Sequence, residues 1–148
     1  MLANIEALHA IHAICSENKP LTADLREWLA RSLERYLGQD CDNLNDAFGV
    51  TQGHGGVPWW KERAIRQRDS ALRILSRRYF DQLTVYCRAR EISMLSRRYQ
   101  GSCWPRDRRR ESMPEHYRRT PKQYLWLAFR SGAKMPLSER RLRTLLGD

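Results

Sequence analysis

The sequence predicts an all-α fold, a compact bundle of six or seven helices with an arginine-rich loop near residues 100–119. Apolar residues recur at helical spacing through most of the chain, most clearly over residues 22–37. The 6 Pro and 8 Gly lie mostly between the periodic segments, and no alternating pattern long enough for a strand is present. A chain of 148 residues buries roughly 70% of its unfolded surface on folding. We therefore expect one helical domain over residues 1–148.

The N-terminal third predicts three helices. Residues 2–16 carry a broad apolar arc that indicates a first helix. Residues 22–37 form the clearest helix, with Thr22 suited to the N-cap and Gly38 to the C-cap. A short helix is expected over residues 43–50.

Two long helices follow a glycine-rich loop at residues 51–58. Pro58 suits the first turn of a helix over residues 59–80, whose apolar and arginine-bearing faces are opposite. Arg68 lies on the apolar side and is expected to extend to solvent or pair with an acid. Residues 83–99 repeat this two-faced arrangement.

The C-terminal part begins with residues 100–119, where Gly, Pro and crowded arginines interrupt the periodicity, so we interpret this segment as an exposed loop. Thr120 and Gln123 have the spacing of a capping box, with Pro121 at the first helical position, and a last helix begins at Ser138. The shared periodicity predicts a core made of Leu25, Trp28, Leu29, Leu33, Ile65, Leu72, Leu75, Ile92, Leu95, Leu125 and Phe129.

Charge is distributed unevenly along the chain. Residues 1–58 carry 4 Lys and Arg against 8 Asp and Glu, a net −4. Residues 59–119 carry 17 against 7, a net +10, and residues 120–148 carry 6 against 2, a net +4. A basic helical region at 59–148 after acidic helices at 1–50 is typical of a surface that binds a polyanion. The 23 Arg against 4 Lys fit phosphate or guanine recognition, although a GC-rich genome gives the same bias.

The arginines of the long helix are the first candidate binding site. They line one face for about four turns, roughly 20 Å at the rise of an α-helix. Arginines of the next helix and of the following loop extend the set. The predicted nucleic-acid-binding residues are Arg63, Arg66, Arg73, Arg77, Arg90, Arg97, Arg106, Arg108, Arg109 and Arg110. The alternative is a solvated face neutralised by the acidic N-terminal third.

Residues 44–51 are the second candidate, because an apolar residue precedes a Gly-apolar-Thr turn there. This segment resembles the first helix and turn of the helix-turn-helix family, and the resemblance implies DNA binding. The chain departs from the pattern at Asn45 and in the turn, which continues for several residues beyond Thr51. The glycines that follow also lead into a helix start that could receive one backbone phosphate, although a mobile connector explains them better.

Neither metal binding nor catalysis is expected. His9, His12 and Cys15 follow one another at helical spacing, but no fourth ligand is evident, so we expect packed histidines. No Ser-His-Asp order, paired carboxylates or nucleophile elbow can be assembled, which predicts a non-enzymatic protein without cofactors. The four cysteines fit free thiols packed in or near the core. No signal peptide and no apolar run of about 20 residues is present, so we expect a cytoplasmic protein that binds no membrane.

Two functions from different classes fit these observations. The first is a small, non-enzymatic nucleic-acid-binding protein, more DNA- than RNA-directed, such as a regulator or a factor of a mobile element or phage. The alternative is an adaptor or inhibitor whose basic face docks on an acidic protein. Aromatic residues within the basic segments, Trp59, Trp60, Trp104 and Tyr117, are candidates for stacking, and Trp104 is expected to be the most exposed.

Overall fold

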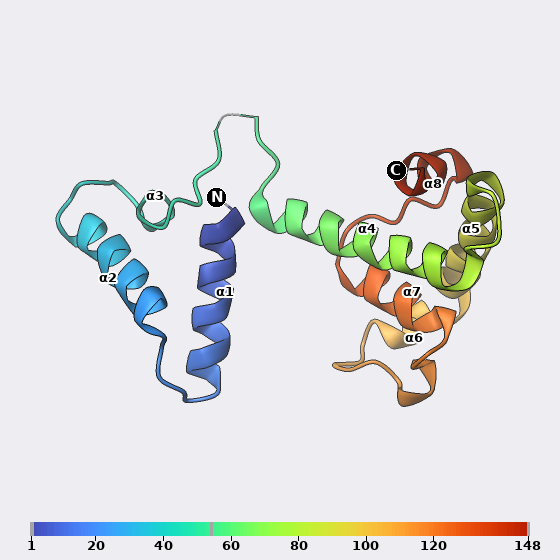
Figure 1. The fold of residues 1–148 in the computed structure, drawn as a ribbon, viewed down its shortest axis with the longest axis horizontal. Coiled ribbons are helices and arrows are strands. Elements are labelled where there is room, and N and C mark those ends of the chain that lie inside the picture. Colours follow the sequence, from blue (N-terminus) through green and yellow to red (C-terminus); the bar gives the residue numbers. More distant parts are fainter. Residues whose placement is uncertain (1, 54, 148) are drawn as a thin grey trace. The chain divides into compact units, whose positions relative to one another are not determined.

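The structure is a computed structural model that describes residues 2–53 and 55–147. These residues form eight α-helices and one 3-10 helix, with no strand among them, which confirms the all-α prediction (Figure 1). The chain divides into two compact units, Met1–Trp59 and Trp60–Asp148. The boundary lies where the charge of the sequence changes sign. A single domain over residues 1–148 stays a prediction.

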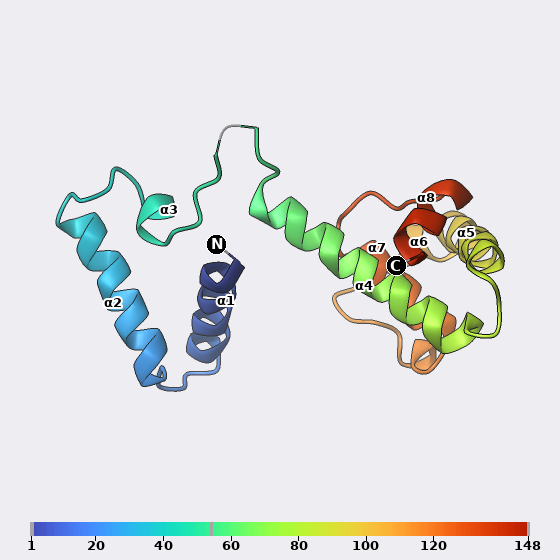
Figure 2. The same ribbon diagram turned by 45° about the horizontal axis from the view of Figure 1, so that its top comes forward.

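The first unit contains α1 (Leu2–Ser16), α2 (Ala23–Leu37) and the short α3 (Leu44–Ala47). In both views α1 and α2 are antiparallel, and the connection joins them at one end (Figures 1 and 2). The predicted caps of α2 are present, because the Thr22 hydroxyl accepts a hydrogen bond from the Leu25 amide at 3.5 Å and Gly38 is the C-cap.

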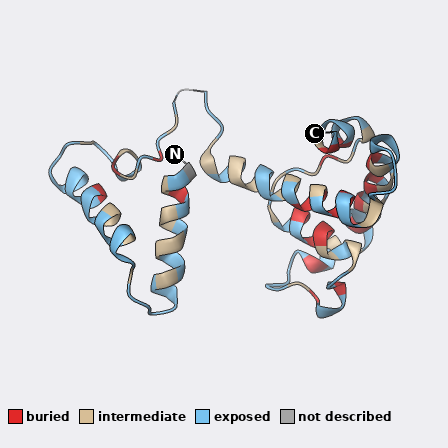
Figure 3. Ribbon diagram, viewed as in Figure 1, coloured by how far each residue is buried: buried red, intermediate tan, exposed pale blue. Residues whose placement is uncertain are grey.

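The core of the first unit is small. Ile5, Ala47 and Val50 are the buried hydrophobic residues among its described positions (Figure 3). The predicted core residues Leu25, Trp28 and Leu29 are half-buried, and the Trp28 ring stacks on Phe48 with 5.7 Å between centroids. Leu33 is exposed, so its assignment to the core was wrong. The neighbour of α2 is the four-residue α3, which is too short to cover the whole apolar face of α2.

The second unit contains the longer helices. In chain order these are α4 (Trp59–Phe80, which begins one residue before the boundary), α5 (Val85–Ser102), α6 (Trp104–Asp107), the 3-10 helix η1 (Glu115–Tyr117), α7 (Pro121–Arg130) and α8 (Glu139–Leu146). Helix α5 packs along α8 and also contacts α6 and α7. Ser138 caps α8 as predicted. Thr120 does not cap α7 with its side chain, because its hydroxyl donates to the Tyr117 carbonyl at 2.7 Å.

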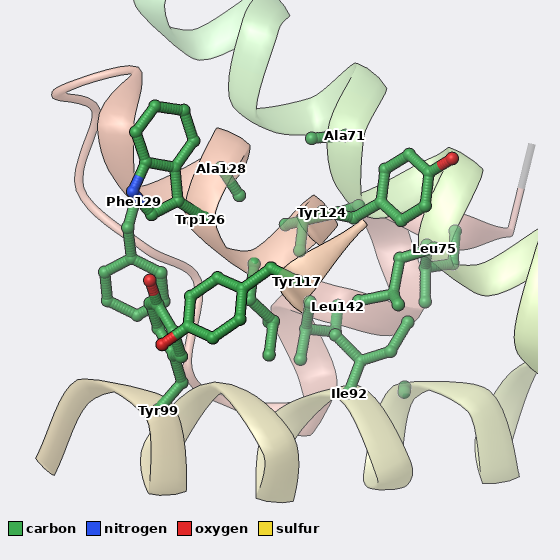
Figure 4. Packing of buried hydrophobic residues seen from close by; sticks show 14 residues of the cluster. Ala71, Leu75, Ile92, Tyr99, Tyr117, Tyr124, Trp126, Ala128, Phe129 and Leu142 are labelled. Carbon is green, nitrogen blue, oxygen red and sulfur yellow. The ribbon is translucent and has the colours of Figure 1, made fainter. Parts of the chain in front are cut away.

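The second unit has a continuous apolar core contributed by α4, α5, α7 and α8 (Figure 4). The predicted core residues Leu72, Leu75, Ile92, Leu125 and Phe129 are buried, and Leu95 packs against them partly buried. Ile65 is exposed, contrary to prediction, because the buried residues of α4 begin only at Ala71. The first three turns of α4 therefore precede the core.

Residues 100–119 are more ordered than the expected loop. They include the end of α5, then α6 and η1, and they are fixed by Asp107 and Tyr117, whose exposed fractions are 0% and 1%. The Asp107 carboxylate accepts hydrogen bonds from the hydroxyls of Tyr99 at 2.9 Å and Tyr117 at 2.7 Å. These bonds join α5, α6 and η1. They order the segment although it has no periodic apolar pattern.

Within residues 2–53 and 55–147, no helix combines the length and apolar character that a membrane span requires.

Candidate nucleic-acid interface

The predicted arginines of α4 lie on the face opposite its buried leucines. Arg66 and Arg77 are exposed, whereas Arg63 and Arg73 are half-buried. The Nη1 atom of Arg63 is buried without a hydrogen-bond partner among the described residues. The face is therefore cationic as predicted, but its members differ in how freely they can move.

Contacts already made by these side chains decide which of them can change partner. Arg73 donates from Nε to the Leu145 carbonyl at 3.2 Å, which ties α4 to α8. Arg66 pairs with Glu62 at 2.5 Å across one exposed turn. Such exposed pairs contribute only about 0.3–0.5 kcal/mol, so a phosphate can replace Glu62 at little cost. Arg77 makes no ion pair or hydrogen bond with any residue that the structure describes.

Four arginines, Arg106, Arg108, Arg109 and Arg110, form a second cationic group that we call the α6 cluster. All four are exposed. The Nε atoms of Arg106 and Arg110 lie 3.4 and 3.7 Å from Asp107 Oδ1. The buried carboxylate thus pairs with two of the four cations, and the cluster keeps a net positive charge.

The charge state of Asp107 follows from its surroundings. Burial alone would raise the pKa of this carboxyl, but the hydroxyls of Tyr117 and Tyr99 and the Arg106 guanidinium outweigh burial and lower the pKa below its usual value. Burial and the hydrogen bond to Asp107 raise the pKa of Tyr117 to about 12 and also raise that of Tyr99. Near neutral pH the network is therefore a carboxylate held by two neutral phenols. The neighbouring Cys103 thiol has a lowered pKa, mainly because Ser102 donates a hydrogen bond to it.

Arg130, which the sequence prediction missed, connects the two cationic groups. Its Nη1 donates to the Arg110 carbonyl at 2.7 Å, and its guanidinium lies 5.6 Å from the centroid of the Trp126 ring. Arg130 and Arg66 also line one open groove between α4 and α7. The arginines of α4 therefore continue through α7 to the α6 cluster. Arg130 gave no distinct signal in the sequence, since a basic residue in the last turn of a helix is common.

The two predicted arginines of α5 lie elsewhere. Arg97 donates to the Leu137 carbonyl at 3.4 Å and so lies beside the segment that precedes α8. Arg90 is exposed. Neither lines the groove between α4 and α7.

The helix-turn-helix resemblance is not supported by the local geometry. Helix α3 has four residues, and α4 begins only at Trp59 after eleven positions, 48–58, of which the described ones are not helical. A helix-turn-helix joins its two helices by a turn of three or four residues. The positive φ of 67° at Gly49 ends α3 and fits a helix terminus.

The histidines and cysteines are less buried than expected. His9, His12 and Cys15 are exposed on α1, and the His9 ring meets Trp59 edge-on at 6.1 Å. Cys15 and Cys87 are exposed, so the expectation that they pack in or near the core was wrong. The i, i+3, i+6 spacing places these α1 residues beside its apolar arc rather than inside it. Among the described residues no group of three His, Cys, Asp or Glu is arranged to hold a metal ion.

The aromatic candidates also differ from the expectation. Trp60 is 57% exposed, whereas Trp104 is half-buried, with its ring centroid 6.3 Å from Tyr99 and 5.4 Å from Phe129. Tyr117 is buried in the Asp107 network and is not accessible for stacking on a base.

Comparison of the chain with models of known protein families, with curated proteins and with solved structures finds no significant match.

Proposed function

We propose that this chain is a non-enzymatic, cytoplasmic nucleic-acid-binding protein that contacts DNA phosphates through α4, α7 and the α6 cluster. The observation that carries this proposal is the charge of the second unit. Residues 60–148 contain 23 Lys and Arg against 9 Asp and Glu, a net +14. Its exposed arginines adjoin one another from Arg66 through Arg130 to Arg110. A contiguous cationic surface of this kind attracts a polyanion and releases the counterions of that polyanion on contact.

The order of the α6 cluster also supports the proposal. Asp107 and Tyr117 hold the backbone that carries Arg106–Arg110, so these arginines do not have to be ordered when the ligand binds. Fixing one residue of a mobile chain costs about 1–2 kcal/mol of backbone entropy. A prearranged cluster avoids most of this cost, so less of its electrostatic attraction for the ligand is lost to ordering the chain.

The test measures binding to duplex DNA, single-stranded DNA and RNA over a range of salt concentrations. Replacing Arg66 and Arg77 with Ala should lower the affinity and flatten the slope of log K against log salt by about two units, since each neutralised phosphate contributes roughly 0.9. Both side chains are exposed, so the melting temperature should change little. The matched control replaces Arg31 and Arg35 of the acidic unit, which removes the same charge and should leave the slope unchanged.

One observation favours docking on an acidic protein as a second candidate function. Ile74 and Leu127 line the groove between α4 and α7 and remain 43% and 42% exposed. Exposed apolar side chains flanked by cations fit an acidic, amphipathic segment of a protein. In that case Ile74→Ser would weaken capture of the partner as much as Arg66→Ala, whereas phosphate contacts would depend on Arg66 alone.

A further inference from the structure

A basic pocket beside the α4 arginines shares Arg73 with the interface described above, but its other residues lie outside that interface. It lies between α4, the segment before α8, and α8 itself, and its volume is about 460 Å³. Its charged lining residues are Arg68, Asp69, Arg73, Lys134 and Arg141. These residues come from three separate parts of the chain and meet around one hollow, unlike the exposed arginines that project along a single helix face.

One arginine holds the pocket together. The Nε and Nη2 atoms of Arg68 lie 2.7 and 2.6 Å from Asp69 Oδ1, and its Nη1 donates to the Lys134 carbonyl at 2.6 Å. The exposed fractions of these two side chains are 15% and 21%, so the pair is shielded from solvent and little affected by salt. Asp69 thereby offsets the charge of Arg68, and Arg68 fixes the segment that carries Lys134.

Three cations around the pocket remain uncompensated. Arg73 is fixed through Nε to the Leu145 carbonyl, and its two terminal nitrogens make no hydrogen bond with the described residues. The side chains of Lys134 and Arg141 make no ion pair or hydrogen bond within residues 2–53 and 55–147. The acid that lines the pocket, Asp69, is already paired. The pocket therefore presents about three positive charges with an arginine fork oriented in advance.

We propose that this pocket binds a phosphate monoester dianion. A terminal phosphate carries nearly two negative charges at neutral pH and several acceptor oxygens, which matches three cations that line one pocket. A phosphodiester carries one negative charge and suits the exposed α4 arginines better. The source of the monoester is either the 5′ end of a nucleic acid or a small phosphorylated molecule. The proposal does not require the nucleic-acid function, because the cations would bind either source.

The first experiment measures the melting temperature of the full chain in inorganic phosphate and in chloride at matched ionic strength. Phosphate at tenfold excess over Kd should raise the melting temperature by about 5–10 °C. Replacing Lys134 and Arg141 with Ala should abolish this rise. The matched control replaces Arg98 and Arg140, two exposed arginines outside the pocket and outside the interface proposed above, and should retain it. Equal melting in the two salts, or a full response in the pocket variant, would overturn the proposal.

Arg73→Lys provides a second readout, because it keeps the charge but removes the fork. It should weaken phosphate binding about tenfold or more, and an unchanged Kd would contradict the assigned geometry.

Oligonucleotides then distinguish the two sources. A chain-end ligand predicts that a 5′-phosphorylated oligonucleotide binds at least tenfold more tightly than its 5′-hydroxyl form, and that the pocket variant loses this difference. A small-molecule ligand predicts that a sugar phosphate raises the melting temperature while the two oligonucleotides bind equally. A phosphate response without any nucleic-acid affinity would refute the proposed function but leave the pocket intact.

Discussion

Tyr117→Phe tests how the arginine-bearing segment between α5 and α7 is held in place. The substitution keeps the aromatic ring in the core and removes the hydroxyl that donates to Asp107 at 2.7 Å. It also removes the 3.5 Å contact between this hydroxyl and Arg106 Nη2. A hydrogen bond to a charged group contributes about 1.5–3 kcal/mol, and Asp107 is fully buried, so water cannot replace the lost donor. We expect the free energy of unfolding to fall by that amount.

Thermal and urea denaturation measure this loss. For a folding unit the size of Trp60–Asp148, a change of 1 kcal/mol shifts the melting temperature by about 4–8 °C. Tyr117→Phe should therefore lower the melting temperature of this unit by roughly 6–24 °C. Tyr86→Phe is the matched control, because the Tyr86 side chain is 54% exposed and its hydroxyl makes no hydrogen bond with the described residues. If Tyr117→Phe melts together with wild type and Tyr86→Phe, the hydroxyl does not hold Asp107 and the segment is ordered by other contacts.

Three further predictions follow from the core, the buried carboxylate and the α6 cluster. Leu72→Ala should cost about 2–5 kcal/mol in urea denaturation because Leu72 is fully buried, and an unchanged midpoint would place this residue at the surface. The folded protein lowers the pKa of Asp107, so this residue stabilises the fold above the unfolded value of about 3.9 and loses that effect as pH falls through the lower folded value. Stability measured between pH 5 and 2 should therefore fall less steeply in Asp107→Asn than in wild type, and parallel curves would contradict this. Arg108→Ala with Arg109→Ala should weaken nucleic-acid binding about as much as the α4 pair, since the cluster is ordered beforehand, and a gel shift with unaltered affinity would exclude the cluster from the interface.

Helix positions were predictable because their signals are local. Thr22, Gly38 and Ser138 mark helix ends through hydrogen bonds to residues a few positions away, and each lies where the structure has a cap. The two-faced pattern of α4 likewise placed Leu72 in the core, because a helix fixes the direction of each side chain from its spacing alone. Of the two outcomes expected for Arg68 on the apolar face, extension to solvent or pairing with an acid, the structure shows the pair with Asp69.

The Asp107 network was not predictable, because its parts meet only in the folded chain. In the sequence Asp107 is one acid among arginines, which indicates solvent exposure. Its burial depends on Tyr99 of α5, which precedes it in the sequence, and on Tyr117 of η1, which follows it. The basic pocket has the same character, since Arg73 and Arg141 lie on helices far apart in the chain. Local periodicity finds a face of one helix but not a site assembled from several elements.

The most direct test of the central claim is the salt dependence of DNA binding by the wild-type chain. The exposed arginines of α4, α7 and the α6 cluster can meet at least four phosphates, so a plot of log K against log salt between 50 and 200 mM should have a slope of about −4 or steeper. Binding that is undetectable near physiological salt for duplex DNA, single-stranded DNA and RNA, or an affinity that does not change with salt, would contradict a phosphate-binding surface on the second unit.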